Sequence, residues 1–339
     1  NDQMKCVKAD ELKKQVVGVF TKRGVPAEDA DIIADVMVHA NLRGVESHGV
    51  IRVPHYIRRL ENGTVDGKAK LDVKKTGPST ATINGNDGYG HVAMVHATKL
   101  AIELAKETGV GVVAVNHSSH CGALSYFGQM AIDAGMVCFC CTQTDGAVVP
   151  FGGRKPFAGT NPLCFAGPSE TGSPIILDMA TSTVAGGHIF KARTDHKPIP
   201  LGWGTDTDGN PTTDPNKAVY FTPAGGPKGY GLGVVVDMLT GILSGGQFGP
   251  HVPGMYTRMD VKRDLAHFVM VVDPARFEGG KTFKARLTEM VNEIHEIPPA
   301  EGFKSVLAPG EPEYLKQEAR KVDGVMLEDY IWDDIINLS

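Results

Sequence analysis

The sequence predicts an α/β or α+β fold in which a core of mixed strands and helices is flanked by helices from both chain ends. Three observations support this prediction: the first ~60 residues show helical periodicity, the middle mixes strands and helices without strict alternation, and the last ~30 residues return to helix. With 339 residues, of which 42% are hydrophobic, the chain can bury a sizeable core. We expect one domain from residues 1–75 together with 300–339, and a second from 76–299.

Helices are expected where apolar residues recur at spacings of three and four and where a glycine follows the last of them. Leu12, Val16 and Phe20 show this spacing before Gly24, and Gly109 ends another such stretch. The expected helices span 10–20, 26–40, 49–60, 91–108, 123–134, 230–243 and 282–296.

Strands are expected where short apolar runs stop at polar or glycine-containing segments. The clearest is the valine-rich run 110–115, which is followed by a polar loop. The expected strands span 80–85, 110–115, 136–142, 163–166, 174–179 and 266–272.

Composition excludes several classes of function. The net charge is −5 with both signs mixed along the chain, so neither a nucleic-acid-binding face nor a basic membrane anchor is expected. No apolar run approaches the ~20 residues needed to span a bilayer, and no signal peptide is expected before the first helix. The six cysteines are interpreted as free thiols, with Cys138 and Cys141 on a strand, which predicts a cytoplasmic protein.

His120 is the leading catalytic candidate. It lies in a polar, glycine-containing loop directly after the 110–115 strand, and the pKa of free histidine is near neutral, which suits proton transfer. A zinc site formed by His117, His120 and Cys121 is a weaker alternative because the spacing lacks a paired set of helix ligands. We therefore expect no metal.

Several glycine-rich loops could hold a phosphate-bearing cofactor. The segment 88–93 matches G-x-G-x-x-A, but its strand is short and no acidic residue ends a second strand ~20 residues later, which disfavours a Rossmann site. No P-loop motif is present. Better candidates are 149–162, 178–183 and especially 223–232, where glycines and Lys228 precede a helix. A proton-transfer residue with a cofactor loop suggests an oxidoreductase.

Six ordered motifs along nearly the whole chain resemble the malate/L-lactate/L-sulfolactate dehydrogenase family. The motifs are Arg43–Gly49 with Arg52, His120–Ala123, Pro150–Gly153, Gly159–Pro162, Asp178–Thr181 and Gly226–Gly231. The resemblance implies an NAD(P)-dependent oxidoreductase with a non-Rossmann, NAD-binding and substrate-binding domain, built on a mixed, largely antiparallel sheet. It also implies a helical domain from the two termini and a homodimer or larger homo-oligomer.

Weaker markers are most similar to family members that oxidise (S)-ureidoglycolate to oxalurate in allantoin catabolism. These markers are Thr212–Pro215, Phe248–Gly249, Met255–Tyr256, Arg263–Leu265, Gly324–Val325 and Asp329–Tyr330. The expected partner is therefore a small 2-hydroxy acid, and the expected cofactor is NAD.

The resemblance and the chemistry together assign roles to individual residues. His120 is expected to be the base, and Arg52 is the natural carboxylate clamp because a guanidinium can bind both oxygens. His48 and Tyr56 share a face with Arg52 if one helix includes all three. Arg263 is a second candidate for the polar end of the substrate, with a surface ion pair as the alternative. For the cofactor, the resemblance points to Thr144, Asp145, Asp178, Met179, Ala180, Lys228, Gly310, Glu311 and Pro312.

Two alternatives remain open. The substrate could instead be malate, lactate, sulfolactate, diketogulonate or a cyclic imino acid, and NADP could replace NAD if His188, Lys191 and Arg193 bind its 2′-phosphate. A non-catalytic or metal-dependent binding protein is the alternative from a different class.

Overall fold

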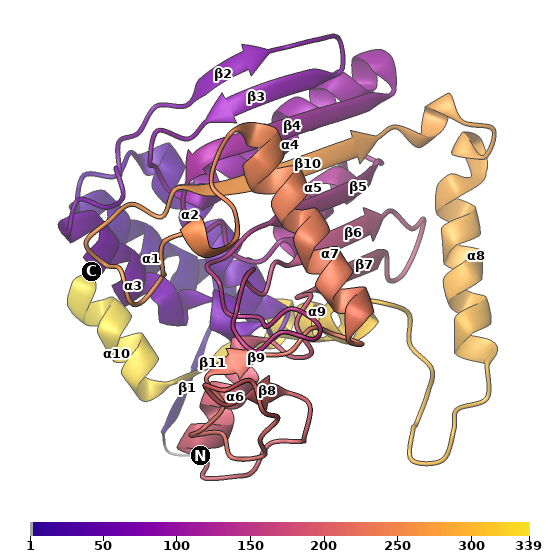
Figure 1. Ribbon diagram of the computed structural model, residues 1–339. Helices are drawn as coiled ribbons and strands as arrows, with labels where there is room; N and C mark the ends of the chain where they lie inside the picture. The colour runs from indigo at the N-terminus through magenta and orange to yellow at the C-terminus, as the bar shows by residue number, and fades with distance from the viewer. Residues whose placement is uncertain (1–2) are drawn as a thin grey trace.

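A seven-stranded mixed sheet organises the chain in the computed structural model, which describes residues 3–339 (Figure 1). In spatial order the strands are β2 (Asp72–Lys75), β3 (Thr80–Asn84), β4 (Val110–Ser118), β10 (Leu265–Val272), β5 (Val137–Thr142), β6 (Leu163–Gly167) and β7 (Ile175–Met179). β3 and β4 pair in parallel and all other neighbours pair antiparallel. The predicted mixed, largely antiparallel sheet is confirmed.

One face of this sheet is covered by helices and forms the main core. α4 (Gly90–Thr108) and α5 (Ser125–Asp133) lie on the strands, and α2 (Ala27–Leu42) and α1 (Ala9–Lys22) pack beyond them. Val113 and Val115 point into this core, because alternate side chains of a strand share a face. Cys138 and Cys140 face the same core, whereas Cys141 faces the other side, as expected for a strand.

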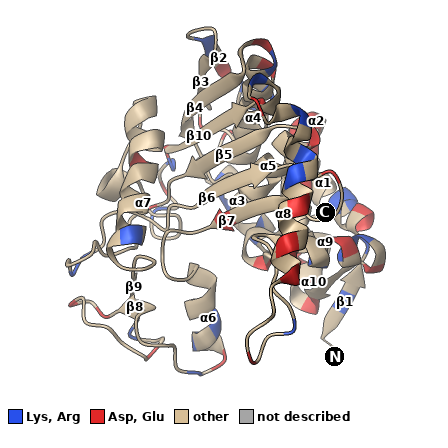
Figure 2. Ribbon diagram, turned by 90° about the vertical axis from the view of Figure 1, so that its right-hand side faces the viewer, with Lys and Arg blue, Asp and Glu red and all other residues tan. Residues whose placement is uncertain are grey.

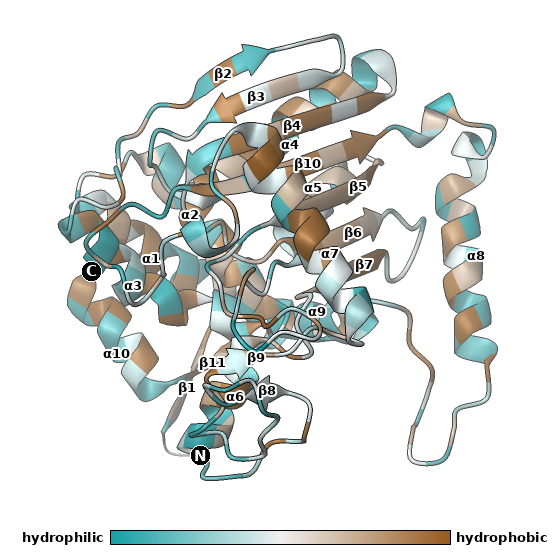
Figure 3. Cartoon of the chain, viewed as in Figure 1, coloured by the Kyte–Doolittle hydropathy of each residue, from teal (hydrophilic) through white to brown (hydrophobic). Residues whose placement is uncertain are grey.

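The second face of the sheet is crossed by α7 (Pro227–Asp237), which continues as a short π-helix over Met238–Ile242. Val236 packs on Phe268 and Leu163 in a smaller core. Figure 3 shows apolar residues along α7. Several of them point away from the sheet and are exposed, so this face of the molecule is unusually apolar.

The two chain ends pack together. β1 (Met4–Val7) pairs antiparallel with β11 (Val325–Glu328), α10 (Asp329–Leu338) contacts α1, and α9 (Glu311–Asp323) contacts α2. The main core is continuous from Val7 and Trp332 to the sheet residue Val113. The division into residues 1–75 with 300–339 and 76–299 stays a prediction.

Two peripheral units complete the fold. α6 (Gly186–Thr194), β8 (Gly204–Thr205) and β9 (Tyr220–Phe221) enclose a small apolar cluster around Ile189. α8 (Phe283–Glu296) packs Leu287 and Val291 at the β7 edge of the sheet, and its charged residues are visible in Figure 2. None of the helices within residues 3–339 is long and apolar enough to cross a membrane.

The predicted helix over 49–60 is wrong at its start. Glu46–His48 and Val50–Arg52 are separate 3₁₀ turns, and α3 begins only at Val53 and ends at Glu61. Gly49 is extended because it passes Asn41, whose Oδ1 accepts from the Val50 amide at 2.8 Å. A Cβ at Gly49 would lie 2.2 Å from that same oxygen, so only glycine fits this extended position between the two turns.

Short or irregular elements were not predicted from periodicity. β4 extends to Ser118 rather than ending at 115, and the C-terminal helices are interrupted by β11. β1, β2, α6, β8 and β9 were also absent from the predicted elements, because four-residue or shorter strands and the weakly amphipathic α6 give little periodic signal.

Gly90 explains the misleading G-x-G-x-x-A segment. It begins α4, between the parallel strands β3 and β4, and a Cβ there would lie 1.9 Å from the Ser119 carbonyl oxygen and 2.6 Å from that of His120. Gly90 therefore allows the loop that carries His120 to pack directly against the first turn of α4. The glycine is needed for this contact within the protein and not for the binding of a cofactor pyrophosphate.

We expect Gly90→Ala to lower the free energy of unfolding by about 1–3 kcal/mol, because the new methyl group overlaps the Ser119 carbonyl. Gly18→Ala is the matched control, since Gly18 is also helical but has open space around its Cβ position. The control should stabilise the protein by roughly 0.4–1 kcal/mol. Urea unfolding measures both, and a Gly90 variant as stable as wild type would contradict the assigned packing.

Candidate active site

A hydrogen bond between Tyr56 and His120 lies at the centre of the site. The Tyr56 hydroxyl is 2.7 Å from His120 Nδ1, and α3 supplies the tyrosine while the loop after β4 supplies the histidine. Because Nδ1 is engaged, the other ring nitrogen, Nε2, is the one free to exchange a proton with a ligand. The structure therefore places Tyr56 against the candidate base.

Two other histidines surround this pair. The His48 ring stacks on His120 with centroids 5.6 Å apart, and the His91 ring meets the Tyr56 ring edge-on at 4.9 Å. Burial, followed by the positive charge of Arg52, lowers the pKa of His120 well below its usual range. Burial also lowers the pKa of His48 to about 4 and that of His91 to about 3. All three rings are therefore neutral near pH 7.

Arg52 lies beside this group at the start of α3. Its Nε donates to the Ser47 carbonyl at 2.7 Å, which fixes the guanidinium in place. Its Nη1 contacts the Tyr256 hydroxyl and the Met255 sulfur, and the guanidinium lies over the Tyr256 ring. Nε and Nη1 both have protein partners, so a carboxylate binds this guanidinium through Nη2 and reaches Nη1 as well only if it displaces the Tyr256 hydroxyl.

Arg263 is buried, which contradicts the alternative of a surface ion pair. Its side chain is 2% exposed, and its Nη2 forms an ion pair with Asp145 Oδ1 at 2.9 Å. Its Nη1 is buried without a hydrogen-bond partner in the described chain. After burial, the positive charge of Arg52 and, to a smaller extent, that of Arg263 contribute to the lowered pKa of His120.

Sequence reasoning missed the residue that holds this part of the site together. The Arg59 side chain is fully buried and its guanidinium donates to four carbonyls of one segment, including those of Val261 at 2.8 Å and Met255 at 2.7 Å. The same segment contains Tyr256, whose hydroxyl contacts Arg52. Arg59 follows Tyr56 by three positions on α3, so helical spacing was the available signal.

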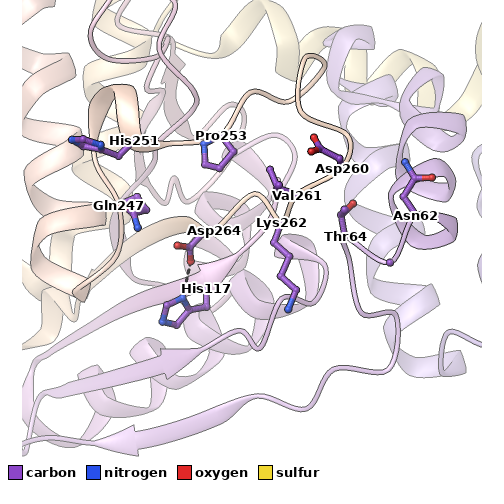
Figure 4. Close-up of a pocket in the computed structure, with 11 residues that line it drawn as sticks. Asn62, Thr64, His117, Gln247, His251, Pro253, Asp260, Val261, Lys262 and Asp264 are labelled. Atoms are coloured by element: carbon purple, nitrogen blue, oxygen red, sulfur yellow. Dashed lines mark hydrogen bonds and ion pairs between the residues drawn. The ribbon is translucent and has the colours of Figure 1, made fainter.

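A cavity of about 560 Å³ is lined by Lys262 and Asp264, the chain neighbours of Arg263, but not by Arg263 itself (Figure 4). His117 Nδ1 bonds Asp264 Oδ1 at 2.6 Å on its wall, and both residues have left-handed backbones, with φ of +47° and +50°. Pro253, whose carbonyl accepts from Arg263 Nε, also lines it. His117 therefore bonds Asp264 on the cavity wall, whereas His120 bonds Tyr56. Within residues 3–339, no cluster of three or more metal-binding side chains occurs.

The predicted cofactor loops are joined by hydrogen bonds. Thr144 Oγ1 accepts from the Thr160 amide at 2.9 Å, and the Thr160 carbonyl accepts from the Thr181 amide at 2.8 Å. The Thr181 carbonyl in turn accepts from Ala224, at the turn before Lys228. Asp145, another predicted cofactor residue, instead directs its carboxylate to Arg263.

The start of α7 has the properties of an anion site. Gly225 and Gly226 have φ of +64° and +68°, and a Cβ at Gly225 would meet nothing closer than 3.9 Å. The exposed Lys228 lies in the first turn of this eleven-residue helix, whose N-terminus favours negative charge. The backbone is therefore open to a phosphate group here.

The remaining predicted cofactor residues lie along β7. Asp178 is exposed at the end of this strand and accepts from the Ser125 amide at 2.9 Å, and Met179 and Ala180 follow it. Gly310 lies against the same strand, where a Cβ would be 2.1 Å from the Ile176 carbonyl oxygen.

Glu311 already has protein partners. It accepts from His295 at 2.7 Å and from the Ala308 amide at 2.9 Å, and Pro312 follows it in α9. Its carboxylate therefore fixes the turn before α9 to α8.

The cations considered for a 2′-phosphate are largely engaged elsewhere. Lys191 pairs with Asp195 at 2.6 Å, and Arg193 Nε donates to the Pro215 carbonyl at 2.6 Å. His188 packs edge-on against Trp203. These contacts give no specific support for NADP.

A neutral, hydrogen-bonded histidine with a fixed arginine nearby suits proton transfer to or from a small acid. The Malate/L-lactate dehydrogenase family profile matches residues 7–336, so the chain belongs to this family of hydroxy-acid oxidoreductases. The predicted resemblance is confirmed.

Individual relatives carry different printed activities. The chain is 36% identical to the ureidoglycolate dehydrogenase (NAD(+)) of Escherichia coli K12, covering 98% of this chain and 95% of that protein. It is 39% identical to the L-sulfolactate dehydrogenase of Methanocaldococcus jannaschii, covering 97% and 95%. The solved sulfolactate dehydrogenase structure from M. jannaschii superposes with a TM-score of 0.92 at 38% identity, covering 98% of this chain and 96% of that one.

Proposed function

We propose that this protein is an NAD-dependent dehydrogenase that oxidises (S)-ureidoglycolate to oxalurate in allantoin catabolism. The observation that carries the catalytic part is the Tyr56–His120 hydrogen bond beside Arg52, which supplies an oriented base next to a carboxylate-binding group. The substrate follows from the similarity to the ureidoglycolate dehydrogenases of E. coli.

In this proposal Arg52 binds the substrate carboxylate and so brings the 2-hydroxyl group to His120. As C2 loses its hydride, the hydroxyl proton passes to His120 Nε2 and the C–O single bond becomes a carbonyl. Tyr56 holds Nδ1 and keeps the ring oriented during this transfer. Nicotinamide, when bound, supplies the hydride acceptor.

The start of α7 fits the pyrophosphate of such a cofactor. The Gly226 amide already donates to the Pro223 carbonyl, so the amide donor proposed here is Gly225, which has open space beside it, and the exposed Lys228 adds a cation for phosphate oxygens. In this proposal Asp178 accepts from a ribose hydroxyl through Oδ1, because its Oδ2 already accepts from the Ser125 amide. We propose Thr144, Met179, Ala180 and the 310–312 turn as further contacts of an extended NAD.

The second candidate is a related 2-hydroxy acid dehydrogenase, or 2-oxo acid reductase, that uses NAD or NADP. It is favoured by the 39% identity to the L-sulfolactate dehydrogenase and the 36% identity to the malate dehydrogenase of Pyrococcus abyssi. The same His120 and Arg52 would serve that reaction.

We expect purified protein to form NADH with racemic ureidoglycolate at a kcat/KM at least tenfold above that with malate, lactate or sulfolactate. His120→Ala should lower turnover by about 10²–10⁴-fold, because the proton acceptor is lost. Absorbance of NADH measures both. Preference for another hydroxy acid would support the second candidate, and no turnover with NAD or NADP would contradict both and favour a binding protein.

We further propose that the protein acts as a homodimer in the cytoplasm. Its six cysteines are free thiols, as in a reducing compartment. Met238, Ile242 and Leu243 are exposed apolar side chains at the end of the helix that covers this face of the sheet, and Phe165 and Leu177 are exposed on paired strands of the same face. An exposed apolar patch of this kind is suited to an interface with a second copy of the chain.

Light scattering should give a mass twice that of the 36.1 kDa chain, and a monomer would contradict the proposed dimer.

A further inference from the structure

The Arg263–Asp145 ion pair has hydrogen-bonding capacity on both of its members. Arg263 Nη2 and Asp145 Oδ1 bond each other at 2.9 Å. Arg263 Nη1 remains a buried donor without a partner in the described chain. The Asp145 side chain is 31% exposed, and no donor to its Oδ2 occurs within residues 3–339. Arg263 therefore keeps one unpaired donor, Nη1, and Asp145 keeps one unpaired acceptor, Oδ2.

A buried donor without a partner, such as Arg263 Nη1, destabilises the folded protein. We therefore infer that a bound ligand supplies the missing acceptor. Nη1 has almost no accessible surface, so a substrate reaches it only when the surrounding side chains shift. In the proposed reaction Arg52 already binds the substrate carboxylate. We therefore assign Arg263 to the opposite end of the substrate.

The charge of Asp145 decides what that far end can be. A second carboxylate or a sulfonate placed on Arg263 would lie close to the Asp145 carboxylate, and like charges in a buried site repel strongly. A neutral amide or ureido group instead carries a carbonyl for Arg263 and an N–H for Asp145. An apolar end would leave both groups unpaired.

We propose that Arg263 and Asp145 together are the specificity determinant of the site, selecting a 2-hydroxy acid with a neutral amide or ureido end over one with a second anion. This inference rests on the proposed dehydrogenase function. It assigns Asp145 to the substrate rather than to the cofactor.

The test compares kcat/KM for ureidoglycolate, malate and lactate in wild type and Asp145→Asn, which removes the charge but keeps the shape. The ratio of ureidoglycolate to malate should fall at least tenfold, chiefly because malate improves. Lactate, which has no polar far end, should change less than about threefold. Asp31→Asn is the control, since this carboxylate is 60% exposed on α2, pairs with Lys13 and should leave the ratio unchanged.

A binding measurement separates this inference from the proposed reaction. Calorimetry with NAD present can compare oxalurate and oxaloacetate, because an oxo acid binds the oxidised complex without reacting. The wild-type protein should bind oxalurate at least tenfold more tightly than oxaloacetate. In Asp145→Asn the ratio of the two dissociation constants should be closer to one. The inference would be overturned if Asp145→Asn lowered kcat/KM equally for all three substrates or left the ratio of ureidoglycolate to malate unchanged. The proposed function would be overturned if no hydroxy acid reacted.

Discussion

The Tyr56–His120 hydrogen bond is the interaction on which the site depends. It joins α3, which belongs to the N-terminal helices, to the loop after β4, which belongs to the sheet. For His120 to act as a base at Nε2, Nδ1 must carry the proton and donate it to the Tyr56 oxygen. Burial then keeps the ring neutral near pH 7, as a proton acceptor requires.

Close backbone approaches allow these elements to meet. Gly90 lets the start of α4 contact the carbonyls of Ser119 and His120, and Gly49 lets the chain pass Asn41 before α3. Arg59 then holds the segment that covers Arg52 through carbonyl contacts. The positions of the charged groups are therefore consequences of tight packing around a few small or buried residues.

Much of this arrangement could be predicted from the sequence. Periodicity located the main helices and strands because each buries a regular face, and the loop position of His120 follows from the polar residues after the valine run. The pairing of Arg263 with Asp145 could not be predicted, because these residues are 118 positions apart and contact only through the fold. Helical spacing from Tyr56 could have drawn attention to Arg59, but its acceptors are main-chain carbonyls and leave no pattern in the sequence.

The pH dependence of kcat/KM tests the central claim most directly. His120 must be neutral to accept a proton, and its lowered pKa keeps it neutral as the pH falls through the usual histidine value of 6.5. The account therefore predicts that kcat/KM stays constant on the acid side down to pH 6.5 and declines only below it. A decline centred at or above pH 6.5 would contradict a buried, neutral His120 as the base.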